Sequence, residues 1–194
     1  MSTATATRTV DGIEIPQPGT WVVDPSHSSV EVVARHMVIS KVRGRFEGFA
    51  GTIVVAERPE DSSVEFVIDA ATIHTADERR DAHLRNSDFL ETDKYPEITF
   101  RSTSVRLAPK KGNWTVTGDL TVRDVTRPVT LDVELEGVGS AYGGPRAVFS
   151  AEVEIDREDF GLTWNMALEA GGVLVGRQLK IELNVQAVPE QPAA

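Results

Sequence analysis

The feature that most constrains the fold is a repeated alternation of apolar and polar residues with a period of two. Successive side chains of a β-strand point to opposite faces, so this pattern is typical of antiparallel strands with one wet and one dry face. Together with residues 46–55, the alternating segments predict about eight strands. They are residues 28–38, 64–70, 98–102, 116–122, 129–135, 147–155 and 179–185.

Eight consecutive antiparallel strands favour a closed barrel, because closure removes the exposed edges of the sheet. The length of 194 residues suits a single domain. Strands of about ten residues tilted near 40° give a barrel about 25 Å long, which suits a long, thin guest. The dry rows contain many small residues, and these favour an interior that is not completely filled: Ser28, Val30, Ala34, Ala70, Ser102, Gly118, Ala147 and Ala151.

Composition excludes several classes of function. The chain has no cysteine and carries a net charge of −10. An acidic surface repels phosphate backbones and anionic headgroups, so we expect no nucleic-acid partner. No run approaches the roughly 20 apolar residues of a transmembrane helix. Residues 1–10 lack the basic and apolar regions of a secretory signal, and this predicts a cytoplasmic location.

The chain is expected to divide into a flexible N-terminal extension over residues 1–19, a barrel domain over 20–188 and a tail over 189–194. The extension is polar and ends in a Pro/Gly-rich run. One segment, around residues 77–90, loses the period of two and predicts a short helix. Asp77 and Glu78 at its start suit the helix dipole.

Few side chains suggest catalysis or metal binding. Asp24, Ser26 and His27 invite a triad hypothesis, which we reject because neighbours on one strand point in alternate directions. No histidine pair has the i,i+4 helical spacing of a zinc motif. We therefore predict no catalytic residue, no metal and no cofactor. His36 shares the dry face and is either a core histidine or a polar contact for a headgroup.

Two further segments admit two interpretations each. The helical segment is either pinned to the barrel by apolar residues or forms a lid, with His83 or Arg85 near an anionic headgroup. The stretch over residues 161–176 combines glycines with Trp164 and several apolar residues. It is either plain core or the entrance of a cavity.

Several motifs resemble those of YceI-like proteins, in order and at the expected spacing over about residues 20–188. The most specific is Arg80-Asp81-Ala-His83-Leu84-Arg85-Asn-Ser-Asp88-Phe89, preceded by Thr75. The others are Trp21–Ser28, His36-Met37, Gly44–Phe46, Tyr95–Ser102, Gly118–Arg123, Val125–Val129, Asp159–Gly161 and Gly171–Gly176. The resemblance implies a lipocalin-like eight-stranded barrel that binds polyisoprenoids or similar lipids. It also implies a role in transport or stress response and a homodimer as a candidate assembly.

The main hypothesis is therefore a non-enzymatic carrier of a long apolar amphiphile, such as a polyisoprenoid or an isoprenoid quinone. An enzyme acting on a lipid-like substrate and a filled barrel acting through protein partners are the alternatives. We expect the headgroup near His36, His83 and Arg85. The predicted apolar pore consists of Val32, Val38, Phe46, Phe66, Ile68, Phe100, Leu120, Leu131, Phe149 and Trp164.

Overall fold

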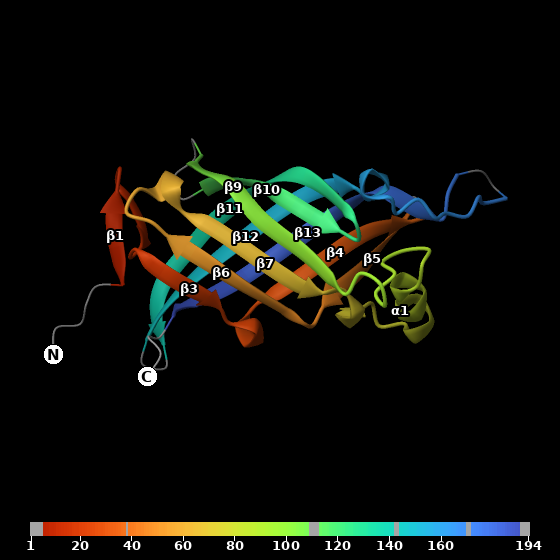
Figure 1. Cartoon of the computed structure of the whole chain (residues 1–194), viewed down its shortest axis with the longest axis horizontal. Helices are drawn as coiled ribbons and strands as arrows, with labels where there is room; N and C mark the ends of the chain where they lie inside the picture. Colours follow the sequence, from red (N-terminus) through yellow and green to blue (C-terminus); the bar gives the residue numbers. More distant parts are fainter. Residues whose placement is uncertain (1–5, 38, 109–112, 142–143, 170–171, 191–194) are drawn as a thin grey trace.

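The computed structural model describes residues 6–37, 39–108, 113–141, 144–169 and 172–190. These residues form a closed antiparallel β-barrel of eight strands with one short α-helix, so the predicted fold class is confirmed. The barrel lies lengthwise in Figure 1, with strand β1 at one end and helix α1 at the other. Its strands are β3 (Gly19–Val23), β4 (Ser29–His36), β5 (Ser40–Phe46), β6 (Phe49–Val55), β7 (Ser63–Asp69), β9 (Glu97–Leu107), β10 (Asn113–Val122), β11 (Val125–Ala141), β12 (Gly144–Asp156) and β13 (Val175–Pro189).

Two of the eight barrel strands are each interrupted once. Strands β3 and β4 both pair with β13 and together make one barrel strand. Strands β5 and β6 pair with β4 and β3, respectively, and together make the next. The 3-10 turn η1 (Pro25–His27) separates β3 from β4. Pro25 has no N–H to donate to the sheet, and the Asp24 carboxylate accepts from the Ser26 N–H instead. The barrel closes where β12 pairs with β13.

Helix α1 (Glu78–Arg85) lies inside the predicted helical segment but is shorter. Asp77 caps it by accepting hydrogen bonds from the N–H groups of Arg79 and Arg80. The short strand β8 (Ile73–His74) precedes the helix and pairs with the end of β5. Strand β5 pairs with β4 along its whole length but with β8 only at Arg45 and Phe46. No helix of the described residues has the length and apolar character to span a membrane.

The N-terminal segment differs from the flexible extension that the sequence predicts. Strands β1 (Thr7–Val10) and β2 (Ile13–Pro16) form a hairpin. Its turn is Asp11–Gly12, with φ of +50° and +78°. Such a two-residue turn matches the twist of a hairpin, and Asp-Gly between apolar residues is a strong hairpin signal. The hairpin folds because Ile15 is buried, at 2 % exposed.

Some small residues of the inward rows do not leave empty space. Ala147 and Ala187 are fully buried and pack against Trp21, which fills the room beside them. A Cβ atom at Gly118 would lie 2.5 Å from the Phe100 ring, so that ring covers the glycine. The interior is therefore partly filled by large side chains placed against small ones.

Candidate ligand cavity

The barrel encloses a cavity of about 450 Å³ whose lining comes from the N-terminal hairpin, the barrel strands and helix α1. This volume falls within the usual range for small-molecule sites. The lining is almost entirely apolar. Of the predicted pore residues, Val38 lies outside the described residues. The others all belong to the lining: Val32, Phe46, Phe66, Ile68, Phe100, Leu120, Leu131, Phe149 and Trp164.

The inward-facing residues show that the barrel is not filled by its own side chains. Val32, Ile68 and Phe149 point into the barrel, yet they are only partly buried. In a close-packed interior, neighbouring atoms would cover such side chains and leave no space beside them for a molecule the size of water. Their remaining accessible surface faces the cavity.

Two glycines on the wall decide how much space remains in it. Gly51 pairs across the sheet with Phe66, and a Cβ atom at Gly51 would lie 2.7 Å from that ring. Phe66 therefore lies against the wall instead of projecting across the cavity. Gly118 is placed in the same way against Phe100, with the Arg101 carbonyl oxygen also 2.5 Å from an added Cβ atom.

Basic side chains gather at the end of the cavity near α1. The lining there includes Arg35, His36, Arg80, His83 and Arg157, whereas Glu31 is the one acidic residue in the described lining. Within the described part of the chain, no hydrogen bond of the His36 imidazole is present. The end of the cavity near α1 therefore combines apolar walls with the nitrogen atoms of arginine and histidine side chains.

His83 belongs to an aromatic cluster at this end. Its ring meets the Trp164 ring edge to face at a centroid distance of 4.5 Å, and the Phe89 ring at 5.0 Å. Its Nε2 atom lies 2.9 Å from an Asp88 carboxylate oxygen. Both His83 and Trp164 line the cavity. The stretch over residues 161–176 thus contributes lining residues, including Leu162 and Leu174, and is not plain core.

Arg157 is a basic residue that the sequence pattern did not single out. It is 1 % exposed and donates to the carbonyl oxygens of Leu162, Val175 and Gly176. Among the described residues, no carboxylate forms an ion pair with it. Burial lowers the pKa of Arg157, but a guanidinium keeps its charge at neutral pH. Within the described part of the chain, the hydrogen bonds of this buried cation thus go to backbone carbonyl oxygens, while the charges of Asp156 and Glu158 act on it without a direct ion pair.

Arg85 has a different position from the one the sequence predicts. It does not line the cavity, and its guanidinium donates to the carbonyl oxygens of Ala71 at 2.7 Å and Ile73 at 2.9 Å. These bonds tie α1 to the 3-10 turn η3 (Ala70–Thr72), which contains Ala71, and to Ile73 just after it. The long side chain of Arg85 reaches these backbone carbonyl oxygens instead of the cavity, and the spacing of residues in the sequence alone does not reveal this.

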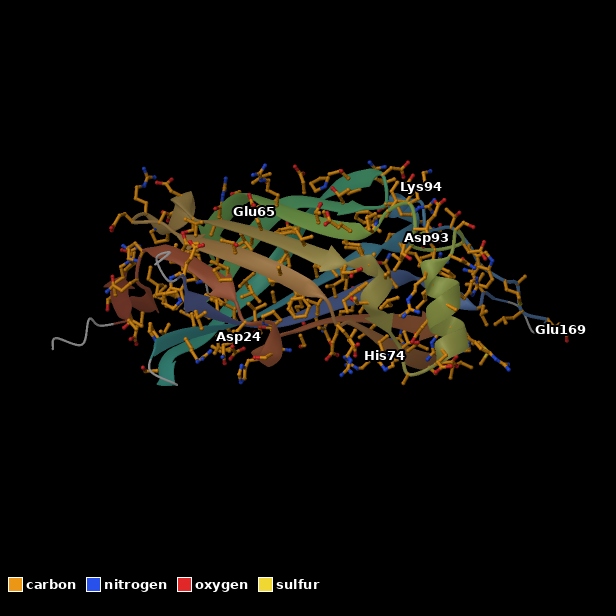
Figure 2. All side chains as sticks on the ribbon, turned by 60° about the horizontal axis from the view of Figure 1, so that its bottom comes forward. Asp24, Glu65, His74, Asp93, Lys94 and Glu169 are labelled. Carbon is orange, nitrogen blue, oxygen red and sulfur yellow. The ribbon has the colours of Figure 1, made fainter. Side chains whose placement is uncertain are left out.

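A buried network fixes the other end of α1. The Asp81 carboxylate is buried and accepts from the N–H and the hydroxyl of Thr75. Arg80 donates to the Thr75 hydroxyl and carbonyl oxygens, and His74 lies 3.3 Å from Asp81. Figure 2 shows His74 beside α1 at this end of the barrel. The residues that made this motif distinctive in the sequence thus hold the helix in place.

The opposite end of the cavity is covered by the N-terminal hairpin. Ile15 and Pro16 are buried and line the cavity there, together with Pro59 of the 3-10 turn η2 (Pro59–Asp61). The polar composition of residues 1–19 predicts an extension, so the sequence pattern does not reveal Ile15 and Pro16 as lining residues. The Asp11-Gly12 turn between apolar residues was the signal that could have found them.

Asp24, Ser26 and His27 do come together, contrary to the reason given for rejecting a triad. They lie on a 3-10 turn and not on one strand, so their side chains meet. However, the same atom of His27, Nδ1, lies 2.9 Å from both the Ser26 hydroxyl and the Asp24 carboxylate. A triad needs the two ring nitrogens to serve different partners. Hydrogen bonds from Ser26 and His27 hold the pKa of Asp24 well below its usual range, and Figure 2 shows Asp24 on the side wall.

Comparison with known proteins gives one family and several related structures. A family model described as YceI-like domain matches residues 21–187. The UPF0312 protein SAS2572 of Staphylococcus aureus (strain MSSA476) is 35% identical over 170 residues, covering 86% of this chain and 95% of that protein. The crystal structure of the Campylobacter jejuni YceI protein has a TM-score of 0.69 at 26% identity, covering 81% of this chain and 90% of that one. A polyisoprenoid binding domain from Saccharophagus degradans shares the fold, with a TM-score of 0.64 at 16% identity over 90% of this chain and 100% of that domain.

Proposed function

This chain belongs to the YceI-like domain family, and from that premise and its cavity we propose that it binds one long apolar amphiphile inside the barrel. The ligand class is a polyisoprenoid, an isoprenoid quinone or a similar lipid. The observation that carries this proposal is the apolar cavity of about 450 Å³ with basic groups at one end. The likeness in fold to a domain described as polyisoprenoid-binding supports the same class.

The apolar chain lies along the inward rows of the strands. It contacts the pore residues, including Phe66 on one wall and Phe149 on another. Burial of apolar surface contributes about 25 cal/mol per Å² before the cost of ordering the ligand. A flexible chain loses conformational freedom on binding, so the walls must bury most of its length to hold it.

The headgroup lies at the end near α1, close to His36 and His83. The buried Arg157 adds a fixed positive charge to this region. A phosphate, carboxylate or carbonyl oxygen accepts hydrogen bonds from such donors. Arg85 serves this site indirectly, because its bonds to Ala71 and Ile73 hold the helix that carries His83.

A cavity-filling substitution tests the proposal. Ala151 lines the cavity on β12, and its neighbour Glu152 points outward to an ion pair with Lys180. Ala151→Trp places an indole where the ligand lies, and we expect affinity for an offered isoprenoid quinone to fall at least about a hundredfold, or about 2.7 kcal/mol. Ligand titration followed by tryptophan fluorescence measures this.

Glu152→Trp is the matched control, since it adds the same side chain to the outer face of the same strand. It should leave the affinity unchanged. Equal affinity in both variants and in the unsubstituted protein would contradict an occupied interior. Circular dichroism of each variant establishes that the barrel is intact.

The absence of catalysis, a cytoplasmic location, a homodimer and a role in transport or stress response stay predictions. They rest on the sequence and on the family resemblance. Turnover of a quinone or prenyl substrate that vanishes in His36→Ala would favour an enzyme instead.

A further inference from the structure

One end of the cavity is closed by the hairpin of β1 and β2. Ile15, at 2 % exposed, and the buried Pro16 both face the cavity. The buried residues Pro59 and Val105 complete this end. The hairpin precedes residues 21–187, which match the family model, so it is a part of this chain outside the matched domain. Figure 1 shows β1 lying across the end of the barrel opposite α1.

Several hydrogen bonds hold the hairpin against the barrel. The Arg8 guanidinium donates to the carbonyl oxygens of Ala56 at 2.5 Å and Glu57 at 2.7 Å, just after β6 ends. The Gln17 side chain donates to the Thr7 carbonyl oxygen, and the Trp21 indole N–H donates to the Gln17 carbonyl oxygen. The hairpin is thus tied at its first strand and just after its second.

The other end of the cavity is more accessible. Arg35 is exposed there, and His36, Trp164 and Leu174 are only partly buried, although all four line the cavity. The two loops that flank this end carry exposed apolar side chains, with Ile39 83% exposed and Met166 54% exposed. A backbone hydrogen bond from Met37 to Leu174 joins these loops. The exposed apolar side chains of these loops favour this end as the access for an apolar ligand.

We propose that the hairpin is the floor of a blind cavity, and that Ile15 and Pro16 set the longest apolar chain the barrel accepts. The inference rests on the proposed function and deepens it, since it assigns a specificity role to residues outside the matched domain. The ligand enters tail first at the α1 end and stops against Ile15. The headgroup then remains near His36 and His83.

A floor has a measurable consequence for chain length. Each added isoprene unit increases affinity while it still finds apolar wall to contact. Once the tail touches Ile15, a longer chain cannot go further in. One isoprene unit next to the headgroup then remains outside the cavity, in water, and the headgroup is displaced from its site. Affinity should therefore rise along a homologous series and then reach a cut-off.

Substitution of Ile15 tests the position of the floor. A tryptophan side chain has about six more heavy atoms than isoleucine, close to the five carbons of one isoprene unit, and a packed cavity has no spare room for them. We expect Ile15→Trp to shift the cut-off down by about one unit. The longest chain that the unsubstituted protein accepts should bind about tenfold more weakly, a loss of about 1.4 kcal/mol.

The probe is a series of all-trans prenyl alcohols of increasing length, competed against a bound fluorescent fatty acid. Glu14→Trp is the matched control, because Glu14 is exposed on the opposite face of the same strand and does not line the cavity. It should keep the original cut-off. A second variant, with residues 1–16 deleted, opens the floor and should accept chains beyond the cut-off without loss of affinity.

The outcomes separate this inference from the proposed function. Binding with the same cut-off in the unsubstituted protein, in Ile15→Trp and in the deletion variant would overturn the floor and leave the proposed function standing. Failure of every prenyl alcohol and of the fatty acid to bind the unsubstituted protein would overturn both. If the deletion variant does not fold, Arg8→Ala replaces it, because this substitution removes the hydrogen bonds to Ala56 and Glu57. In Arg8→Ala, prenyl alcohols beyond the original cut-off should bind more tightly than they do to the unsubstituted protein.

Discussion

Asp81 shows how one buried residue positions the end of the cavity near α1. Its carboxylate is buried and accepts hydrogen bonds from the N–H and the hydroxyl of Thr75. The hydroxyl and carbonyl oxygens of Thr75 in turn accept hydrogen bonds from Arg80. Because Thr75 immediately follows β8, the network joins α1 to the barrel wall. His83 is carried by this helix, so its place at the cavity depends on Asp81.

Replacing Asp81 should therefore destabilise the protein. Asp81→Ala leaves the buried Thr75 N–H without its acceptor, and we expect the free energy of unfolding to fall by about 1–3 kcal/mol. Urea-induced unfolding measures this. Glu78→Ala is the control on the same helix; Glu78 is exposed and contributes at most through the helix dipole, below about 1 kcal/mol. Equal losses in the two variants would contradict the structural role of Asp81.

Residue-level prediction from sequence succeeded where side-chain direction follows strand parity. Val32, Phe66 and Phe149 line the cavity because residues two apart share a face. It did not succeed for Arg85 and Arg157, whose long side chains reach backbone carbonyl groups that no spacing rule identifies. The Asp24 cluster was misjudged for a related reason, since a 3-10 turn replaced the expected strand.

At the scale of strands, two glycines keep the cavity open in different ways. The three atoms nearest to an added Cβ atom at Gly51 all belong to the Phe66 ring, which can rotate away. An added Cβ atom at Gly118 also meets the Arg101 carbonyl oxygen, which is part of the sheet and cannot move freely. The same substitution should therefore have different consequences on the two strands.

We expect Gly51→Ala to push the Phe66 ring into the cavity and to weaken ligand binding, while the unfolding free energy changes by less than about 1 kcal/mol. Gly118→Ala should lower the unfolding free energy by about 1–3 kcal/mol, as overpacking does. Urea unfolding and quinone titration of both variants provide the comparison. Similar unfolding energies for the two would count against this distinction.

Secondary-structure elements were predicted unevenly along the chain. The alternating rows located the barrel strands, because one wet and one dry face leave a clear period of two. The short helix was found from the loss of that period, and its start from Asp77. The hairpin of β1 and β2 was missed because a polar composition outweighed the Asp11-Gly12 turn, and only its packing on the barrel shows why it folds.

At the scale of the whole molecule, the barrel is closed around its side, covered by the hairpin at one end and flanked near α1 by loops with exposed apolar side chains. The sequence favoured an unfilled interior from its small inward residues, but Trp21 and Phe100 occupy part of that space. The cavity depends on how large and small side chains pair across strands. That pairing requires the register, which the sequence pattern alone does not provide.

The most direct test of the account is native mass spectrometry of the purified protein, followed by solvent extraction of whatever it releases. The account predicts one bound mass per chain that extraction identifies as a prenyl chain, an isoprenoid quinone or another long amphiphile. A mass equal to the chain alone, with no uptake of offered quinones, prenyl phosphates or fatty acids, would contradict it. That result would favour the alternative of a barrel that acts through protein partners.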